Sequence, residues 1–321
     1  MTLELVNLNT IIYNNYIMLL SFIKNIFKKI FSGCFNQLFE SCLKTHLYTE
    51  FNHYNELKDK SSIQNKVNQH VLFNQYKETN SSSKLVDTNL SIFSQDNEDG
   101  IILQIFSKIG FGSKSFIEIG SGNGTLFSNC ANLCVHFGFD GIFIDCNEKK
   151  LNEGVSFYKN CFSTYLNQPK FVQAFVSKEN INSIIDTNYK NQNVDLLSID
   201  IDGNDYWILD QLKSVRPRVI VLEINPFFAN ESVSVKYNPS FSLENINENI
   251  YGMSALAAIK LCKQKEYKLV ATNSKGFNLF FVDNQESSAF EAITPNEIFQ
   301  KRYFREHSGG FIFNDEEYVK F

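Results

Sequence analysis

Residues 116–124 read FIEIGSGNG, an apolar run that carries one acid and ends in three glycines within five residues. The run over 115–119 is bounded by a glycine-rich turn, which is typical of a buried strand. Because Gly120, Gly122 and Gly124 lack Cβ atoms, the chain can turn sharply there and pass close to a ligand. A helix after such a turn points unpaired backbone N–H groups at the same place. The stretch therefore predicts a ligand-binding loop between a strand and a helix.

The chain after Ser94 alternates short apolar runs with helical patterns, which indicates a parallel sheet wrapped by helices. Further strands are predicted at 141–146, 170–176, 194–201 and 218–224. Helices are predicted at 126–138, 148–159, 206–213 and 254–266. Two last strands, 267–273 and 277–283, are separated by the short SKG turn and predict an antiparallel hairpin. The expected fold is α/β and Rossmann-like, a seven-stranded, mostly parallel sheet with an antiparallel last strand.

Two acids narrow the ligand of the glycine loop. Asp145 ends the next strand about twenty residues later, where a doubly wound sheet places a carboxylate against ribose hydroxyls; the alternative is a cap of the following helix. Glu118 interrupts the first strand, where burial without a partner is costly, so it can accept from an amine group of a ligand. A dinucleotide-binding loop normally reads G-x-G-x-x-G, and this loop departs from that pattern because residue 125 is Thr where the third glycine would stand. The carboxylate of Glu118 would also repel the pyrophosphate of a dinucleotide. These features favour S-adenosylmethionine over NAD.

A family resemblance rests on six motifs that occur in order along the chain. They are SQDNEDGIILQIF (94–106), FIEIGSGNGT (116–125), GIFIDCN (141–147), DLLSIDIDGNDYWIL (195–209), RPRVIVLEINPFF (216–228) and SKGFNLFFV (274–282). Together they resemble a branch of the FkbM-type S-adenosylmethionine-dependent methyltransferases, over roughly residues 90 to 285. The resemblance implies a class I methyltransferase fold and, because the family is associated with glycan pathways, O-methylation of a sugar or glycan precursor.

The residues expected to bind the cofactor follow from the loop, its acids and this resemblance. They are Glu118, Gly120, Ser121, Gly122, Asn123, Gly124, Asp145 and Gln95. The resemblance alone implies that Gln95 lies near the cofactor or the substrate. The acids after it, Asp96, Glu98 and Asp99, are explained equally well by a helix N-terminus, where acids are favourable.

Carboxylates gather after two neighbouring strands of the predicted sheet. Asp200, Asp202 and Asp205 follow one strand, and Glu223 ends the next. Methylating a hydroxyl requires a base to take its proton or a metal to lower its pKa. We expect Asp202 and Asp200 to be catalytic, and Asp200, Asp202 and Glu223 to be candidate ligands of a divalent metal such as magnesium. The structural alternative is that Asp205 caps a helix and Asp200 binds backbone amides.

Composition limits the partners and the rival functions. The net charge of −5 and the lack of a basic block argue against nucleic acid, so a small-molecule or glycan substrate is expected. The seven cysteines show no C-x-x-C pair and are expected to be structural thiols in a reducing compartment. Two rivals to the methyltransferase are a non-catalytic binding module with the same fold and an NAD-dependent enzyme.

The ends of the chain carry other patterns. We expect a helical leader at 1–50, a polar linker at 51–90, the methyltransferase-like domain at 91–285, and a tail at 286–321 that the sequence does not place. Residues 16–31 place apolar side chains at helical spacing, with lysines on the opposite face. This pattern fits a helix on a membrane surface, or a helix packed on its own domain or a partner. The expected location is cytoplasmic, with peripheral membrane contact as the alternative.

Overall fold

The computed structural model describes residues 55–79, 82–85, 88–190, 193–241, 251–307 and 317–321. The chain divides into two compact units, Met1–Asp59 and Lys60–Phe321. Only residues 55–59 of the first unit are described, and they are helical. The predicted leader, with its amphipathic stretch at 16–31, lies outside the described residues. Across the described ranges, no helix is both long enough and apolar enough to cross a bilayer.

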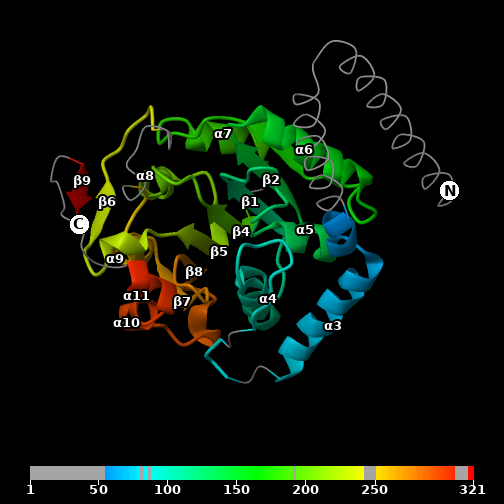
Figure 1. The fold of residues 1–321 in the computed structure, drawn as a ribbon, viewed down its shortest axis with the longest axis horizontal. Helices are drawn as coiled ribbons and strands as arrows, with labels where there is room; N and C mark the ends of the chain where they lie inside the picture. The colour runs from blue at the N-terminus through cyan, green and yellow to red at the C-terminus, as the bar shows by residue number, and fades with distance from the viewer. Residues whose placement is uncertain (1–54, 80–81, 86–87, 191–192, 242–250, 308–316) are drawn as a thin grey trace, which may run out of the picture. The chain divides into compact units, whose positions relative to one another are not determined.

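The second unit is built on a seven-stranded sheet with the order β3-β2-β1-β4-β5-β8-β7 (Figure 1). Its strands are β1 Ser115–Ile119, β2 Asp140–Asp145, β3 Lys170–Gln173, β4 Asn193–Ile199, β5 Arg216–Glu223, β7 Tyr267–Thr272 and β8 Asn278–Asp283. The pairs among β1 to β5 are parallel, whereas β8 is antiparallel to β5 and to β7. This order with a reversed strand is the class I methyltransferase arrangement, so the predicted fold class and the hairpin are confirmed.

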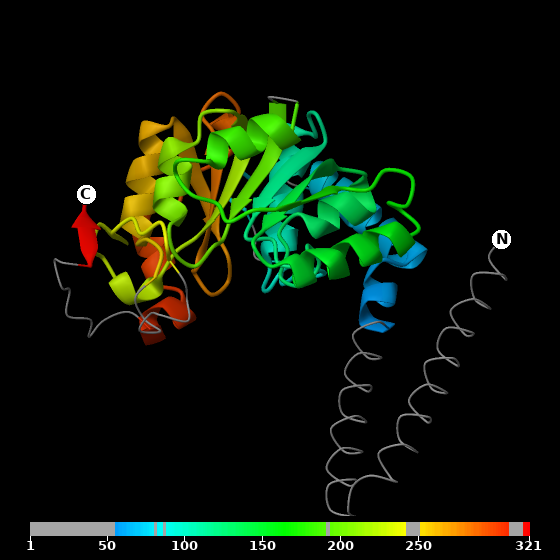
Figure 2. The same cartoon turned by 90° about the horizontal axis from the view of Figure 1, so that it is seen from above.

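Helices cover both faces of the sheet (Figures 1 and 2). They are α4 Glu98–Ile109, α5 Ala131–Phe137, α6 Glu148–Asn160, α7 Ile181–Asn188, α8 Asp205–Gln211 and α9 Ala255–Gln264. Helix α3, Ile63–Thr79, packs on α4 and α5. Side chains alternate between the faces of a strand, so Ile117 and Ile119 join a core with α7, α8 and α9. On the other face, Phe116 contacts Phe143, which in turn contacts Tyr158 of α6.

A small second sheet and the chain's end pack beside the main sheet. Its strands, β6 Val233–Val235 and β9 Tyr318–Lys320, are antiparallel. The remaining short helices are η1 Pro226–Phe228, η3 Ser287–Ala289, α10 Pro295–Phe299 and α11 Arg302–His307. Phe304 of α11 is buried in the main core with Ile298 of α10. The tail that the sequence could not place is therefore part of the folded domain.

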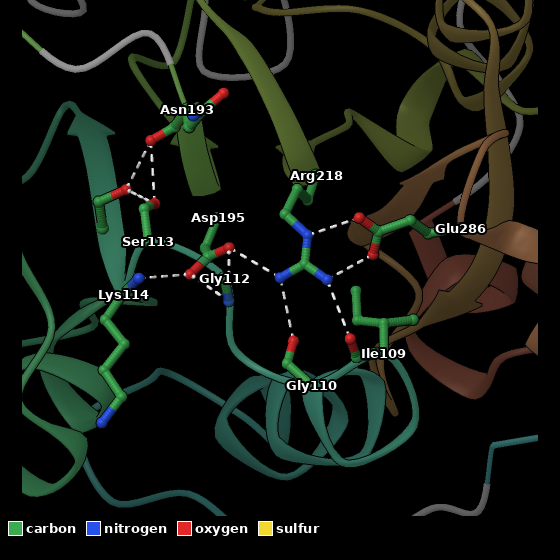
Figure 3. A network of polar contacts seen from close by, with 10 residues as sticks. Ile109, Gly110, Gly112, Ser113, Lys114, Asn193, Asp195, Arg218 and Glu286 are labelled. Carbon is green, nitrogen blue, oxygen red and sulfur yellow. Dashed lines mark hydrogen bonds and ion pairs between the residues drawn. The ribbon is translucent and has the colours of Figure 1, made fainter.

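An ion-pair network fixes the amino ends of β4 and β5 (Figure 3). The guanidinium of Arg218 donates to both carboxylate oxygens of Glu286, at 2.7 and 2.5 Å, and to the fully buried Asp195 at 2.8 Å. It also donates to the carbonyl oxygens of Ile109 and Gly110, each at 3.0 Å. A planar guanidinium that donates to two carboxylates and two carbonyls stabilises the fold more than an exposed ion pair does. This network ties the end of α4 to the sheet at the edge opposite the glycine loop.

Among the segments that differ from the sequence-based expectation, two have a clear physical reason. The helix expected from residue 126 begins at Ala131, because Ser128 and Asn129 hydrogen-bond to Glu118 and hold the chain in a loop until there. Within the segment expected to be a polar linker, residues 63–79 form α3. Its Phe73 packs against Phe111 at 4.7 Å between ring centroids, so this helix is anchored by a few apolar contacts.

Candidate functional site

The glycine loop, residues 120–124, lies at the carboxyl end of β1, next to the end of β4. Gly120 has φ +81, and a Cβ on it would lie only 1.6 Å from the backbone oxygen of Asp200. Gly122 has φ +56, but its Cβ would meet nothing closer than the Lys150 side chain at 3.8 Å. The first glycine is therefore required by the packing of two strand ends. The second is required by its left-handed backbone and leaves open space for a ligand.

Helix α6 supports the loop from one side. The Tyr158 hydroxyl donates to the carbonyl oxygen of Gly124 at 2.6 Å, and Gly154 lets the loop carbonyl of Asn123 approach the helix. The Asn123 side chain accepts from the backbone N–H groups of the two residues after Gly124, so it shapes the loop itself. Ser121 is buried, and its hydroxyl has no hydrogen-bond partner among the described residues. An unpaired buried hydroxyl in a ligand loop is a group that a ligand can satisfy.

Glu118 is buried beneath the loop. One carboxylate oxygen accepts from the Ser128 hydroxyl at 2.6 Å, and the other accepts from the Asn129 backbone N–H at 2.9 Å. Burial raises the pKa of the Glu118 carboxyl from 4.5 to about 7. The carboxylate therefore positions the chain after the glycine loop. Its expected contact with an amine of the cofactor stays a prediction.

This burial predicts a pH dependence of stability. Between about 4.5 and about 7 the folded protein keeps the Glu118 proton while the unfolded chain releases it, so the free energy of unfolding falls as pH rises through this window. The difference of about 2.5 pH units corresponds to about 3 kcal/mol. Glu118→Gln has no proton to lose, so urea unfolding at pH 4.5, 6 and 7.5 should show a weaker fall than in the wild type. Equal slopes in the two proteins would contradict this assignment.

Asp145 lies where the sequence places it, at the end of β2 facing the loop. One carboxylate oxygen accepts from the Gly122 N–H at 2.7 Å, and the other accepts from the Asn147 N–H at 2.7 Å. The side chain of Asn147, and not Asp145, caps α6 by accepting from Lys150 N. A carboxylate offers about four lone-pair sites, so half-exposed Asp145 keeps room for two ribose hydroxyls.

The acids after β4 and β5 converge beside the glycine loop. Asp200, Asp202 and Glu223, which we call the acid triad, each offer one oxygen within 4.8 Å of the others. Adjacent parallel strands end at the same edge, and the Asp200 N–H donates to the Ile119 carbonyl at 3.0 Å, so the triad borders Gly120. Asp202 has φ +55, a left-handed conformation that non-glycine residues adopt rarely and often at functional sites.

The electrostatics of the acid triad are those of like charges in a half-buried site. Burial, followed by repulsion from Asp202 and Asp205, raises the pKa of Asp200 to about 8. Burial and the charges of Asp200 and Asp202 raise the pKa of Glu223 well above its ordinary value. Burial also raises the pKa of Asp202. The arrangement therefore favours either a bound proton or a cation among the three carboxylates.

The fourth acid, Asp205, has a structural task. Its two oxygens accept from the backbone N–H groups of Ile201 and Gly203, both at 2.8 Å. Burial raises its pKa to about 6 despite these two hydrogen bonds. Asp205 thus shapes the loop that presents Asp202, in agreement with the helix-start alternative, and contributes no atom to the triad.

Gln95 is exposed on a loop that buried acids hold in place. Asp99 accepts from three backbone N–H groups, those of residues 92, 93 and 94. Glu98 accepts from the side chains of Asn273 and Asn278, each at 2.9 Å, and Asn278 is paired with Glu223 across the sheet. The Gln95 loop therefore lies at the same edge of the sheet as the acid triad, although no contact assigns Gln95 a ligand.

The thiols of the described residues match the structural expectation. Cys130, Cys134, Cys161 and Cys262 are buried, and burial raises the pKa of Cys130 and Cys134 well above the ordinary value. Cys146, next to Asp145, is exposed. No group of cysteines or histidines in the described part of the chain forms a metal-binding cluster; the acid triad is the candidate there.

Comparison with known proteins identifies the domain around these acids. Residues 153–243 match the family model described as the Methyltransferase FkbM domain. Over these residues the chain is similar to the FkbM methyltransferase domain. The matched residues include both strand ends that bear the acid triad, and the glycine loop precedes them on the same sheet. Together with the class I strand order, the FkbM match makes this protein an S-adenosylmethionine-dependent methyltransferase by class.

Solved structures show only distant likeness to this FkbM-domain protein. A candidate S-adenosylmethionine-dependent methyltransferase from Listeria monocytogenes is 11% identical with a TM-score of 0.39, covering 57% of this chain and 95% of that one. An O-methyltransferase from Bacillus cereus in complex with SAH is 14% identical with a TM-score of 0.35, and the match covers 67% of this chain and 90% of that one. Scores this low carry no argument about ligand or acceptor. A search of curated protein sequences finds no match.

Proposed function

We propose that this protein transfers the methyl group of S-adenosylmethionine to a hydroxyl group of a sugar or glycan precursor. The observation that carries the proposal is the acid triad, three carboxylates within 4.8 Å, directly beside Gly120 of the cofactor loop. Methyl transfer to oxygen requires removal of the hydroxyl proton, and carboxylates serve this step as bases or as metal ligands. A polar acceptor also fits a half-buried, acid-lined edge better than an apolar one.

The donor side of the site is provided by β1 and β2. The open space next to Gly122, the unpaired hydroxyl of Ser121 and the carboxylate of Asp145 face the position of a nucleoside. In an open α/β sheet this ligand lies beyond the carboxyl ends of the strands. S-adenosylmethionine held there would lie beside the ends of β4 and β5, which carry the acid triad.

The acid triad suits a divalent cation such as Mg²⁺. Three carboxylate oxygens close together are the hard donor set that this ion prefers. Burial raises the pKa of Asp200 and Glu223, repulsion among the acids raises it further, and a cation relieves that repulsion. A bound cation would supply a lower pKa for the acceptor hydroxyl. Asp202, which has a left-handed backbone in the loop after β4, would hold the cation or take the proton itself.

The reaction balances without a further reactant. The hydroxyl oxygen forms a bond to the methyl carbon as the bond from that carbon to the sulfonium sulfur breaks. The hydroxyl proton passes to a carboxylate of the acid triad, and the products are the methyl ether and S-adenosylhomocysteine, whose thioether sulfur no longer carries a charge. The protein orients the two substrates, excludes water and accepts the proton, which together supply the largest contributions to such a rate.

Calorimetry with S-adenosylhomocysteine tests the donor half of the proposal. The full chain is expected to bind it with a micromolar dissociation constant, and Asp145→Asn should weaken binding about 10-fold by removing one charged partner of the ribose hydroxyls, about 1.4 kcal/mol. Asp186→Asn, an exposed acid on α7, is the matched control and should bind as the wild type does. Heat with NAD and none with S-adenosylhomocysteine would overturn the proposal.

A further inference from the structure

Four aromatic side chains from three distant segments lie around the end of β5. Phe227 belongs to η1, Tyr251 precedes α9, and Tyr303 and His307 belong to α11. We call them the aromatic cluster. Each is half-buried, unlike the aromatics of the core, which are almost fully buried. Figures 1 and 2 show that α11 comes back to this edge of the sheet, where it packs on η1.

Ring contacts join the cluster. The His307 ring stacks on Tyr303 with centroids 3.9 Å apart and meets Phe227 edge-on at 5.7 Å. Tyr303 in turn contacts Phe277, which is buried beneath it, at 5.8 Å. Offset and edge-on pairs of this kind fix the orientation of the rings. The rings of Phe227, Tyr303 and His307 are therefore a preformed aromatic surface and not a set of independent side chains.

One hydrogen bond determines the chemistry of His307. Its Nδ1 lies 2.8 Å from the carbonyl oxygen of Tyr303, and a carbonyl oxygen can only accept. Nδ1 therefore carries the proton, and in the neutral ring Nε2 holds a lone pair. The cluster combines an aromatic surface with a hydrogen-bond acceptor that a hydroxyl group can use.

Backbone contacts anchor the cluster next to the acid triad. The Asn225 side chain donates to the Tyr251 carbonyl at 3.0 Å, and the Ile224 N–H donates to the Phe277 carbonyl at 2.7 Å. Both anchoring residues follow Glu223 within two positions. Burial and the charges of Glu223 and Asp202 raise the pKa of Tyr251, so its phenol stays protonated as a donor.

We propose that the aromatic cluster is the acceptor subsite and binds the pyranose ring of a sugar by its C–H face. The inference rests on the proposed function and adds the residues that hold the acceptor. A pyranose has an apolar C–H face for the rings and hydroxyl edges for His307 Nε2 and the Tyr251 hydroxyl, which is the mixture that the cluster offers. A purely apolar acceptor would leave those polar groups unused. A ring held on this surface directs a hydroxyl toward Glu223 and its partners.

Saturation-transfer NMR tests this subsite on the full chain. The probes are the methyl pyranosides of glucose, galactose, mannose, rhamnose and fucose, with S-adenosylhomocysteine and Mg²⁺ present. We expect ring-proton signals from at least one probe with the wild type and a fall of about 5-fold or more in Tyr303→Ala and His307→Ala, since each removes half of the stacked pair. Tyr165→Ala is the matched control and should keep the signal, because Tyr165 is an exposed aromatic in the loop before β3, at the opposite edge.

The outcomes separate the two proposals. S-adenosylhomocysteine binding, measured by calorimetry, should be unchanged in Tyr303→Ala and His307→Ala, because neither residue touches the glycine loop. Signals that are equal in the wild type and both variants, or absent for every probe while S-adenosylhomocysteine binds, would overturn the subsite. Loss of S-adenosylhomocysteine binding in the wild type would instead overturn the proposed function. If Tyr303→Ala fails to fold, His307→Gln, which keeps bulk but removes the aromatic ring, decides the question.

Discussion

Gly120→Ala is expected to destabilise the protein by about 4 kcal/mol or more, which is a large part of the stability of a typical domain. The added Cβ would lie 1.6 Å from the backbone oxygen of Asp200 and 3.1 Å from the Ile201 side chain. Backbone cannot move aside as a flexible side chain can. The ends of β1 and β4 would have to separate, and this would break the hydrogen bond from Asp200 N to Ile119 O.

Two other glycines separate the clash from the cost of a left-handed backbone. Gly138 has φ +71, and apart from its chain neighbours no atom of the described residues lies within 4 Å of the place that a Cβ would take, so Gly138→Ala should cost only about 1 kcal/mol. Gly122→Ala should cost a similar amount, because its φ is +56 and its surroundings are open. Its methyl group, however, would enter the space assigned to the cofactor, so S-adenosylhomocysteine should bind about 10-fold or more weakly, a loss of about 1.4 kcal/mol.

Urea unfolding of the three variants measures the first effect, and calorimetry with S-adenosylhomocysteine measures the second. The expected ranking of lost stability is Gly120→Ala far above Gly138→Ala and Gly122→Ala. Among the variants that fold, Gly122→Ala should lose the most affinity for S-adenosylhomocysteine. If Gly120→Ala and Gly138→Ala lost equal stability, the close contact between β1 and Asp200 would be wrong.

The parts of the fold and site that follow from local pattern were predictable. The run before Gly120 and the position of Asp145 fix two neighbouring strand ends, because parallel strands alternate with helices and share one carboxyl edge. The same rule brings Asp200 and Glu223 together from adjacent strands, although they are separated along the chain. Each of these contacts follows from the shared carboxyl edge of neighbouring parallel strands.

Contacts that depend on side chains meeting across loops were not predictable. The sequence predicts that Glu118 binds a ligand, and it does not predict the hydrogen bonds from Ser128 and Asn129 that delay the start of α5. For the tail, residues 286–321, the sequence shows only that it is aromatic and charged. Its helix α11 returns to η1 because Phe304 is buried in the core, and this brings His307 against Phe227 across eighty positions of sequence. No periodicity in either segment specifies such a contact.

Asp202→Asn is expected to lower the rate of methyl transfer by about 1,000-fold, equivalent to about 4 kcal/mol of transition-state stabilisation. Asn has the size of Asp and tolerates the φ of +55 found at this position, so the backbone should not change. The substitution removes one of three carboxylates that lie within 4.8 Å of one another. Neither a cation ligand nor a proton acceptor of equal strength remains in its place.

Transfer is measured with labelled S-adenosylmethionine and a panel of pyranosides and nucleotide sugars, with Mg²⁺ or with a chelator. Asp186→Asn is the control of equal charge change on an exposed helix and should retain the wild-type rate. S-adenosylhomocysteine binding should persist in Asp202→Asn, because the cofactor loop is untouched. A wild-type rate in Asp202→Asn would remove Asp202 from the chemistry, while the FkbM domain and its cofactor loop would stand.

The cation dependence of the same variant separates the two roles of Asp202. As a ligand, Asp202 contributes to affinity, so excess Mg²⁺ should restore part of the rate of Asp202→Asn, and a chelator should stop the wild type. As the base, it takes the hydroxyl proton, so no concentration of Mg²⁺ restores the rate. Burial, followed by repulsion from Asp202 and Asp205, raises the pKa of Asp200 to about 8. The repulsion favours the first role, because a cation relieves it and a lone base does not. Removing one of the three carboxylates should also lower the repulsion within the acid triad and stabilise the cation-free protein. We therefore expect a higher melting temperature for Asp202→Asn than for the wild type in the presence of a chelator.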